Sequence, residues 1–129
     1  MSYYFSKTLS VPFEVAIEKV TAALGSKGFG VLTTIDVKAT LKKKLDVDFR
    51  PYTILGACNP GFAYQALQKE SRIGTMLPCN VIVQQTSEGT VEVSAVDPIA
   101  SMQAIENPEL GGIAGEVQAL LKEVVDSLE

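Results

Sequence analysis

The stretch CNVIVQQTSEGTVEVSAV, residues 79–96, decides the fold of this chain. Apolar side chains recur at every second position on both sides of a turn formed by Ser87, Glu88 and Gly89. The apolar positions are Cys79, Val81, Val83, Val91, Val93 and Ala95. Alternation with a period of two is typical of a half-buried strand, and a short turn with glycine joins antiparallel strands. The stretch therefore predicts a β-hairpin with one buried face and one face in water.

Three further runs towards the N-terminus also favour strands. They are Tyr3–Leu9, a run in which Phe29, Val31 and Ile35 share one face, and Tyr52–Ala57, which delivers Cys58 at its end. Apolar residues at helical spacing separate or follow these runs. The predicted helices begin at Pro12, at Val37 in a short lysine-rich turn ending at Leu45, at Pro60, at Pro98 in a short stretch, and after Gly111-Gly112.

These elements predict an α+β fold: a single two-layer domain over residues 1–129, with a mixed five-stranded sheet packed against about three helices. We expect the sheet to be mixed because a helix of about a dozen residues separates the strand ending at Cys58 from the strand beginning at Cys79, and such units most often form parallel crossovers. The two cysteines would then lie about 20 Å apart at opposite ends of the sheet, beyond the reach of a disulfide, and could act together only across a dimer interface. If the two strands were antiparallel instead, the cysteines would lie at one edge and could meet.

Composition excludes several classes of function. The chain of 129 residues has 47% hydrophobic residues, a formal net charge of −4 and no histidine. An acidic surface repels nucleic acid and anionic membranes, and no apolar run approaches the ~20 residues that span a bilayer. Without histidine there is no Ser-His-Asp triad and no Cys-His dyad. With no leader pattern at the N-terminus and only two cysteines, we expect a cytoplasmic protein without a metal site or cofactor.

The best site candidates are two cysteine motifs that mirror each other, Cys58-Asn59-Pro60 and Pro78-Cys79-Asn80. Cys58 is expected just outside a helix N-terminus, where the helix dipole and free N–H groups favour a thiolate. The structural alternative is a small buried hydrophobe, and it is favoured for Cys58 and more strongly for Cys79. Capping of the following helix accounts for Asn59, whereas Asn80 faces solvent, satisfies a turn or contacts a ligand.

Other candidate features have ordinary structural explanations. The three lysines of Lys42–Lys44 fit a solvated helix face better than an anion site. Asp36 and Asp97 end strands, and both fit helix capping. Gly111-Gly112 opens a helix, but Glu109 and Glu116 flank it and no Walker lysine is present, so a phosphate site is disfavoured.

With these residues in view, the chain resembles the family known as domain of unknown function 302. Five segments carry the resemblance: residues 28–36, residues 40–45, residues 50–60 with the first cysteine motif, residues 77–81 with the second, and Asp97-Pro98. The resemblance implies a small α+β domain, often a homodimer, with no established reaction, cofactor or ligand.

Two functional hypotheses follow. The first is a non-catalytic dimeric module that binds a small molecule or a protein partner near the two cysteine motifs. The second is a thiol-dependent redox or sulfur-transfer activity with Cys58 as nucleophile and Cys79 as resolving thiol. We favour the binding module, because a thiolate without histidine or a close CxxC pair would depend on the helix terminus alone.

Overall fold

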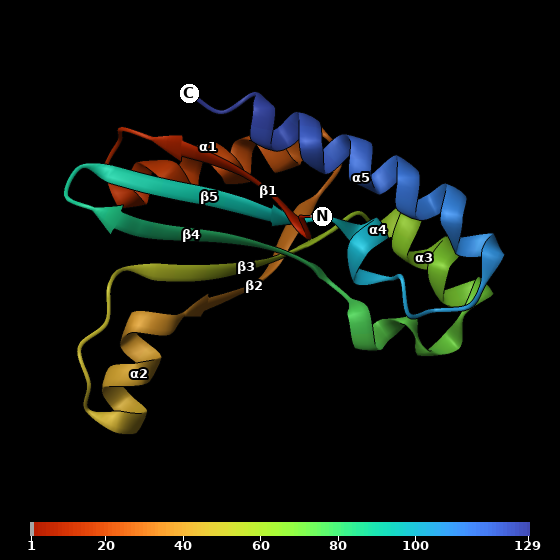
Figure 1. Ribbon diagram of the computed structural model, residues 1–129, viewed down its shortest axis with the longest axis horizontal. Coiled ribbons are helices and arrows are strands. Elements are labelled where there is room, and N and C mark those ends of the chain that lie inside the picture. The colour runs from red at the N-terminus through yellow and green to blue at the C-terminus, as the bar shows by residue number, and fades with distance from the viewer. Residues whose placement is uncertain (1) are drawn as a thin grey trace.

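The computed structural model describes residues 2–129, within which five strands form one sheet in the order β1-β5-β4-β3-β2 (Figure 1). The strands are β1 Tyr4–Leu9, β2 Gly30–Asp36, β3 Tyr52–Cys58, β4 Cys79–Ser87 and β5 Thr90–Val96. The helices are α1 Phe13–Ser26, α2 Val37–Leu45, α3 Pro60–Lys69, α4 Pro98–Ser101 and α5 Gly111–Asp126, with 3-10 helices η1 Ser71–Met76 and η2 Pro108–Leu110. The α+β class and the five strands are confirmed.

All four strand pairings are antiparallel. The prediction of a mixed sheet is wrong, because it assumed that β3 and β4 run parallel. Strands β3 and β4 are neighbours, and Ala57 lies opposite Cys79. The chain does not cross a face of the sheet between them. Instead α3 and η1 lie beyond the end of the sheet, and the chain returns from the same end at which it left (Figure 1).

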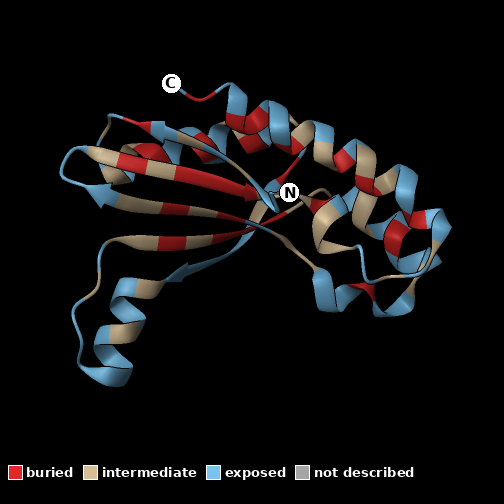
Figure 2. Ribbon diagram, viewed as in Figure 1, coloured by how far each residue is buried: buried red, intermediate tan, exposed pale blue. Residues whose placement is uncertain are grey.

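The predicted hairpin is present as β4 and β5, and its apolar positions form the centre of the structure. Val81, Val83, Val91, Val93 and Ala95 are at most 1% exposed. Helices α1 and α5 pack over this face of the sheet (Figure 1), and the buried positions follow it (Figure 2). We call this cluster, with its buried helix residues such as Val20, Leu24 and Leu121, the main core.

The face of the sheet opposite α1 and α5 carries Tyr52, Ile82 and Gln84, and we call it the open face; α2 contacts the sheet at β2 and β3, on the side of the β2 edge. A chain of side-chain hydrogen bonds runs across it. Arg50 Nε donates to Gln84 Oε1 at 3.0 Å, Gln84 Nε2 donates to Glu92 Oε1 at 3.1 Å, and Ser94 Oγ donates to Glu92 Oε1 at 3.4 Å. This agrees with the predicted wet face of the hairpin, because its polar groups satisfy one another.

A second, smaller cluster lies beyond the end of the sheet, and we call it the end cluster. Its buried members are Ala66 from α3, Ile73 from η1 and Leu110 from η2, with Leu77, Met102 and Ile105 packed against them. The same helices gather at one end of the molecule in Figure 1. Helix α5 begins beside this cluster and continues over the sheet, so it joins the two regions.

The two predicted aspartate caps are present. Asp36 Oδ1 accepts from Ala39 N at 2.9 Å at the start of α2. Asp97 Oδ1 accepts from Ile99 N at 3.0 Å at the start of α4, and both carboxylate oxygens also accept from Gln118 Nε2 at 3.1 Å. Asp97 thus caps α4 and ties it to α5.

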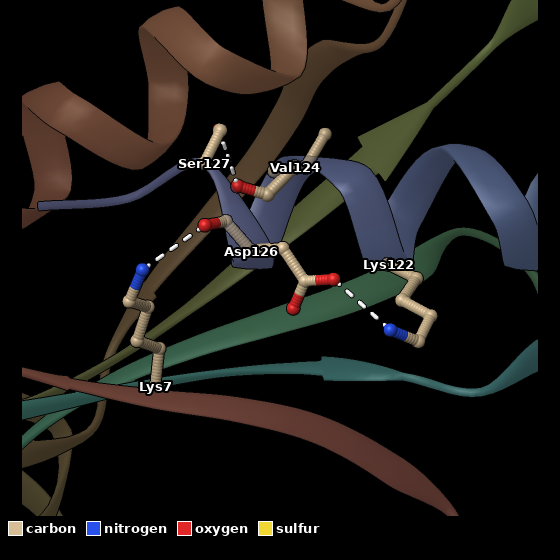
Figure 3. Close-up of polar contacts among 5 residues, drawn as sticks. All are labelled: Lys7, Lys122, Val124, Asp126 and Ser127. Atoms are coloured by element: carbon tan, nitrogen blue, oxygen red, sulfur yellow. Dashed lines mark hydrogen bonds and ion pairs between the residues drawn. The ribbon is translucent and has the colours of Figure 1, made fainter.

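The last turn of α5 is fastened to the first strand. Lys7 Nζ donates to the backbone carbonyl of Asp126 at 3.0 Å, and Lys122 pairs with the Asp126 carboxylate at 3.0 Å (Figure 3). Ser127 Oγ donates to the carbonyl of Val124 at 2.8 Å. These contacts satisfy carbonyl groups that a helix end leaves without partners.

None of the helices over residues 2–129 combines the length and the apolar character that crossing a membrane requires.

Candidate functional site

A cavity lies between the main core and the end cluster. Its walls come from the end of β3, the start of β4, and helices α3, α4 and α5. It leaves about 40 Å³ for the centres of water-sized molecules. One such sphere needs about 10–15 Å³, so the cavity has room for about three atoms of that size. None of the side chains that line it is charged.

The two cysteines meet at this cavity, which the sequence did not predict. Both line it, and both are free thiols. Cys58 follows Ala57, the residue opposite Cys79, so ladder geometry places the two cysteine Cα atoms about 6 Å apart. The predicted separation of about 20 Å is wrong, because it assumed that β3 and β4 run parallel. A single chain therefore brings both thiols to one site.

Burial makes Cys79 a poor thiolate. Loss of hydration, followed by the charge of neighbouring Cys58, raises the pKa of Cys79 from 9.0 to about 11. An apolar wall disfavours the charged form of any group that it surrounds. At neutral pH Cys79 is therefore a protonated, weakly polar group on the cavity wall.

Asn59 has a different role from the one that capping predicts. It occupies the position before α3, but its side chain makes no cap hydrogen bond. The amide instead lies against two glycines: a Cβ at Gly28 would be 3.1 Å from Asn59 Nδ2, and a Cβ at Gly61 would be 3.7 Å from Oδ1. Gly28 also has a φ of +85°, which L side chains rarely adopt. Asn59 lines the cavity, but the surface that the wall exposes there is almost entirely apolar.

The rim beside Cys79 depends on another glycine. A Cβ at Gly56 on β3 would lie 2.8 Å from Pro78 Cγ and would also overlap Thr33 Oγ1. Pro78 therefore packs directly on the backbone of β3 and lines the cavity. A side chain at Gly56 would push this part of the wall outwards.

The structure brings four of the six predicted site residues together: Cys58, Asn59, Pro78 and Cys79 line the cavity. Pro60 is exposed and serves as the first residue of α3. Asn80 is exposed and lies on the open face, in a shallow depression with Tyr52 and Ile82. These two are not part of the cavity wall.

The sequence interpretation missed the opposite wall, which α5, η2 and the residue after α4 supply. Met102, Leu110, Ile113, Ala114 and Val117 line it. Helical spacing had identified Ile113 and Val117 as members of a buried stripe, and both belong to or pack against the main core. The sequence did contain one signal for this wall, the length of the apolar stripe on α5. Helix α5 extends past the sheet that it covers, so part of its stripe is left to line the cavity.

Over residues 2–129, no group of three or more His, Cys, Asp or Glu side chains is arranged to hold a metal ion. The chemistry of the cavity therefore rests on two thiols, one amide and apolar surface.

The fold and the cavity define a class of small α+β domains with a five-stranded antiparallel sheet that helices cover on one face. Beyond one end of the sheet, short helices between β3 and β4 help to form an apolar cavity. The sequence model of the family described as "Domain of unknown function DUF302" matches residues 5–128. The chain belongs to this family.

A solved structure supports the assignment. The crystal structure of an uncharacterized conserved DUF302 protein from Bacillus stearothermophilus superposes with a TM-score of 0.91 at 28% sequence identity, covering 100% of both chains. No curated protein matches the chain.

Proposed function

We propose that this chain forms a single non-catalytic module that binds a small, uncharged, largely apolar molecule in the cavity and acts as a homodimer. The observation that carries the proposal is a cavity whose exposed wall is almost entirely apolar. Ligand sites are typically apolar enclosures with a few polar groups that orient the ligand.

The physical chemistry of the wall restricts the ligand. No charged side chain lines the cavity, and the raised pKa of Cys79 indicates that a negative charge is disfavoured there. Almost none of the exposed wall is polar, so binding depends on apolar contact with the ligand. A volume of about 40 Å³ suits a body of only a few heavy atoms unless the wall moves.

Two probes of equal size test this class of ligand: acetone, which is neutral, and acetate, which is charged. In amide-resolved NMR titrations, acetone should shift the backbone signals of Cys58, Asn59 and Cys79, and acetate should leave them unchanged. Equal shifts from both probes, or shifts confined to the open face, would contradict the proposal.

A variant that fills the cavity tests whether acetone binds there. Ala114 lines the cavity and is 7% exposed, so Ala114→Leu should fill it and abolish the acetone shifts. Ala22 lies exposed on α1, so Ala22→Leu adds the same atoms elsewhere and should leave them intact. Acetone shifts that survive in Ala114→Leu would place binding outside the cavity.

The open face supports the dimer in the proposal. Tyr4, which is 41% exposed, lies on it with the partly buried Tyr52, Ile82 and Val96, and all four line one shallow depression of the surface. A second copy of the same face would remove these side chains from water. Light scattering at micromolar concentration should return twice the chain mass, falling to one chain mass in Ile82→Lys but not in Ala22→Lys. A single-chain mass for the parent would remove the dimer.

Thiol chemistry at Cys58 is the second candidate, and the proximity of the two cysteines favours it. The raised pKa of Cys79 opposes it, because a resolving thiol attacks as the thiolate. Iodoacetamide should modify Cys58 in the folded chain no faster than a cysteine in a short peptide at pH 7. Labelling that is much faster would favour thiol chemistry over passive binding.

A further inference from the structure

Two cysteine sulfur atoms, which are soft metal ligands, line the cavity, and no carboxylate or imidazole lines it with them. The sulfur atoms of Cys58 and Cys79 are the only ionisable side-chain atoms on its wall, and both cysteines are free. They come from adjacent antiparallel strands whose register places their Cα atoms about 6 Å apart. A disulfide is the usual explanation for such a pair, and it is not formed here.

The position of the pair also explains why both side chains reach one cavity. Successive residues of a strand point to opposite faces of a sheet, so Cys58 and Cys79 would diverge in the middle of one. However, Cys58 is the last residue of β3 and Cys79 the first of β4. Both cysteines line the cavity, which lies where β3 ends and β4 begins.

We propose that Cys58 and Cys79 together bind one Cu(I) ion, or another soft monovalent ion of the same class, at the wall of the apolar cavity. Thiolate sulfur selects soft ions, of which Cu(I) is the main biological example. Because Cys79 is protonated at neutral pH, Cu(I) binds by displacing the thiol protons, which are released to solvent. Cu(I) is stable with two or three sulfur ligands, and the apolar wall limits access of water to the bound ion.

The ligand count argues against zinc. Zn(II) is held by four ligands in structural sites and by three plus water in catalytic ones, drawn from Cys, His, Asp and Glu. Across residues 2–129 no such set of three is available, and the chain has no histidine. Two thiolates alone leave Zn(II) incompletely coordinated.

The inference shares the cavity with the proposed function but does not depend on an organic ligand. The two are separable by experiment, since the acetone titration reads out the apolar space and a metal titration reads out the thiols. Failure of either leaves the other standing.

The test is an anaerobic titration of the reduced chain with Cu(I) against a chromophoric Cu(I) chelator. The parent should withdraw one Cu(I) per chain, and Cys58→Ser and Cys79→Ser should each weaken binding by at least about 100-fold, more than loss of an outer-shell partner does. Ala22→Ser makes a change on the exposed surface of α1 and keeps both thiols, so it should bind within about threefold of the parent.

X-ray absorption on the loaded parent keeps the test decisive if a serine variant fails to fold. Copper should have sulfur neighbours only. No withdrawal of Cu(I) by the parent, equal binding by either serine variant, nitrogen or oxygen ligands at copper, or tighter binding of Zn(II) than of Cu(I) would each overturn the inference.

Discussion

The main core and the end cluster are built from the same kinds of side chain but differ in the number of buried residues and in the elements that supply them. The main core contains 17 buried residues drawn from the sheet and from α1 and α5, whereas the end cluster contains only three, drawn from short helices. Burial of apolar surface is the main source of stability, so the sheet region should be much the more stable of the two. The cavity lies where they meet. A site placed there has a rigid wall from the strands and a movable one from the end cluster, which suits entry of a ligand.

The largest effect should follow from damage to the main core. Leu121 on α5 is fully buried, so Leu121→Ala should lower the free energy of unfolding by about 3–5 kcal/mol. Denaturant unfolding followed by circular dichroism measures it. Leu32 is 68% exposed on β2, and Leu32→Ala should change stability by less than about 0.5 kcal/mol. Equal effects of the two substitutions would contradict the assignment of the core.

Damage to the end cluster should be smaller and local. Ile73 is fully buried in η1, but few residues surround it, so we expect Ile73→Ala to cost about 2 kcal/mol, the low end for such a truncation. Hydrogen exchange should accelerate over residues 60–78 and 98–110 while β4 and β5 stay protected. Uniform loss of protection would mean that the two regions unfold as one unit. Ile99→Ala, at a position 40% exposed in α4, serves as the control.

The cavity between the regions should make stability fall at high pH. Cys79 has a pKa of about 11 in the folded chain against 9.0 when hydrated, so between these values the folded state holds the proton that the unfolded state has lost. The contribution of this group to stability is fully present below pH 9 and is lost as the pH rises to about 11, by at most about 3 kcal/mol. Cys79→Ala should remove this part of the slope in denaturant unfolding. An identical slope in the variant would assign it to other groups.

The smallest effect concerns the link between the regions. Asp97 caps α4 and accepts from Gln118 on α5, so Asp97→Ala should cost about 1 kcal/mol. Exchange of α4 amides should increase while that of β5 amides does not. Asp36→Ala removes a comparable cap from α2, which has no buried residue, and should leave α4 unchanged. Faster α4 exchange in both variants would show that the Gln118 contact is irrelevant.

Local chemistry made most of the elements predictable. Alternating valines identified β4 and β5, the run to Ser26 has helical spacing, and a short polar side chain before each of α2 and α4 identified their caps. Asn59 is the instructive exception. It occupies a cap position before Pro60, yet its amide lies against Gly28 and Gly61, two glycines that leave it room. A capping rule sees only the residues of one turn, whereas the side chain responds to whatever space its neighbours leave.

The sequence by itself determined the α+β class, the elements and the four residues Cys58, Asn59, Pro78 and Cys79 as candidates for one or two sites. Only the tertiary structure decided that these four share one cavity. The reason is the direction of β4 relative to β3. Side-chain patterns determine whether a segment is a strand and which face it buries, but they are the same for a strand running in either direction. Direction depends on where α3 and η1 find apolar partners, and those partners, Leu110 and Met102, come from a part of the chain more than 25 residues further on than Met76.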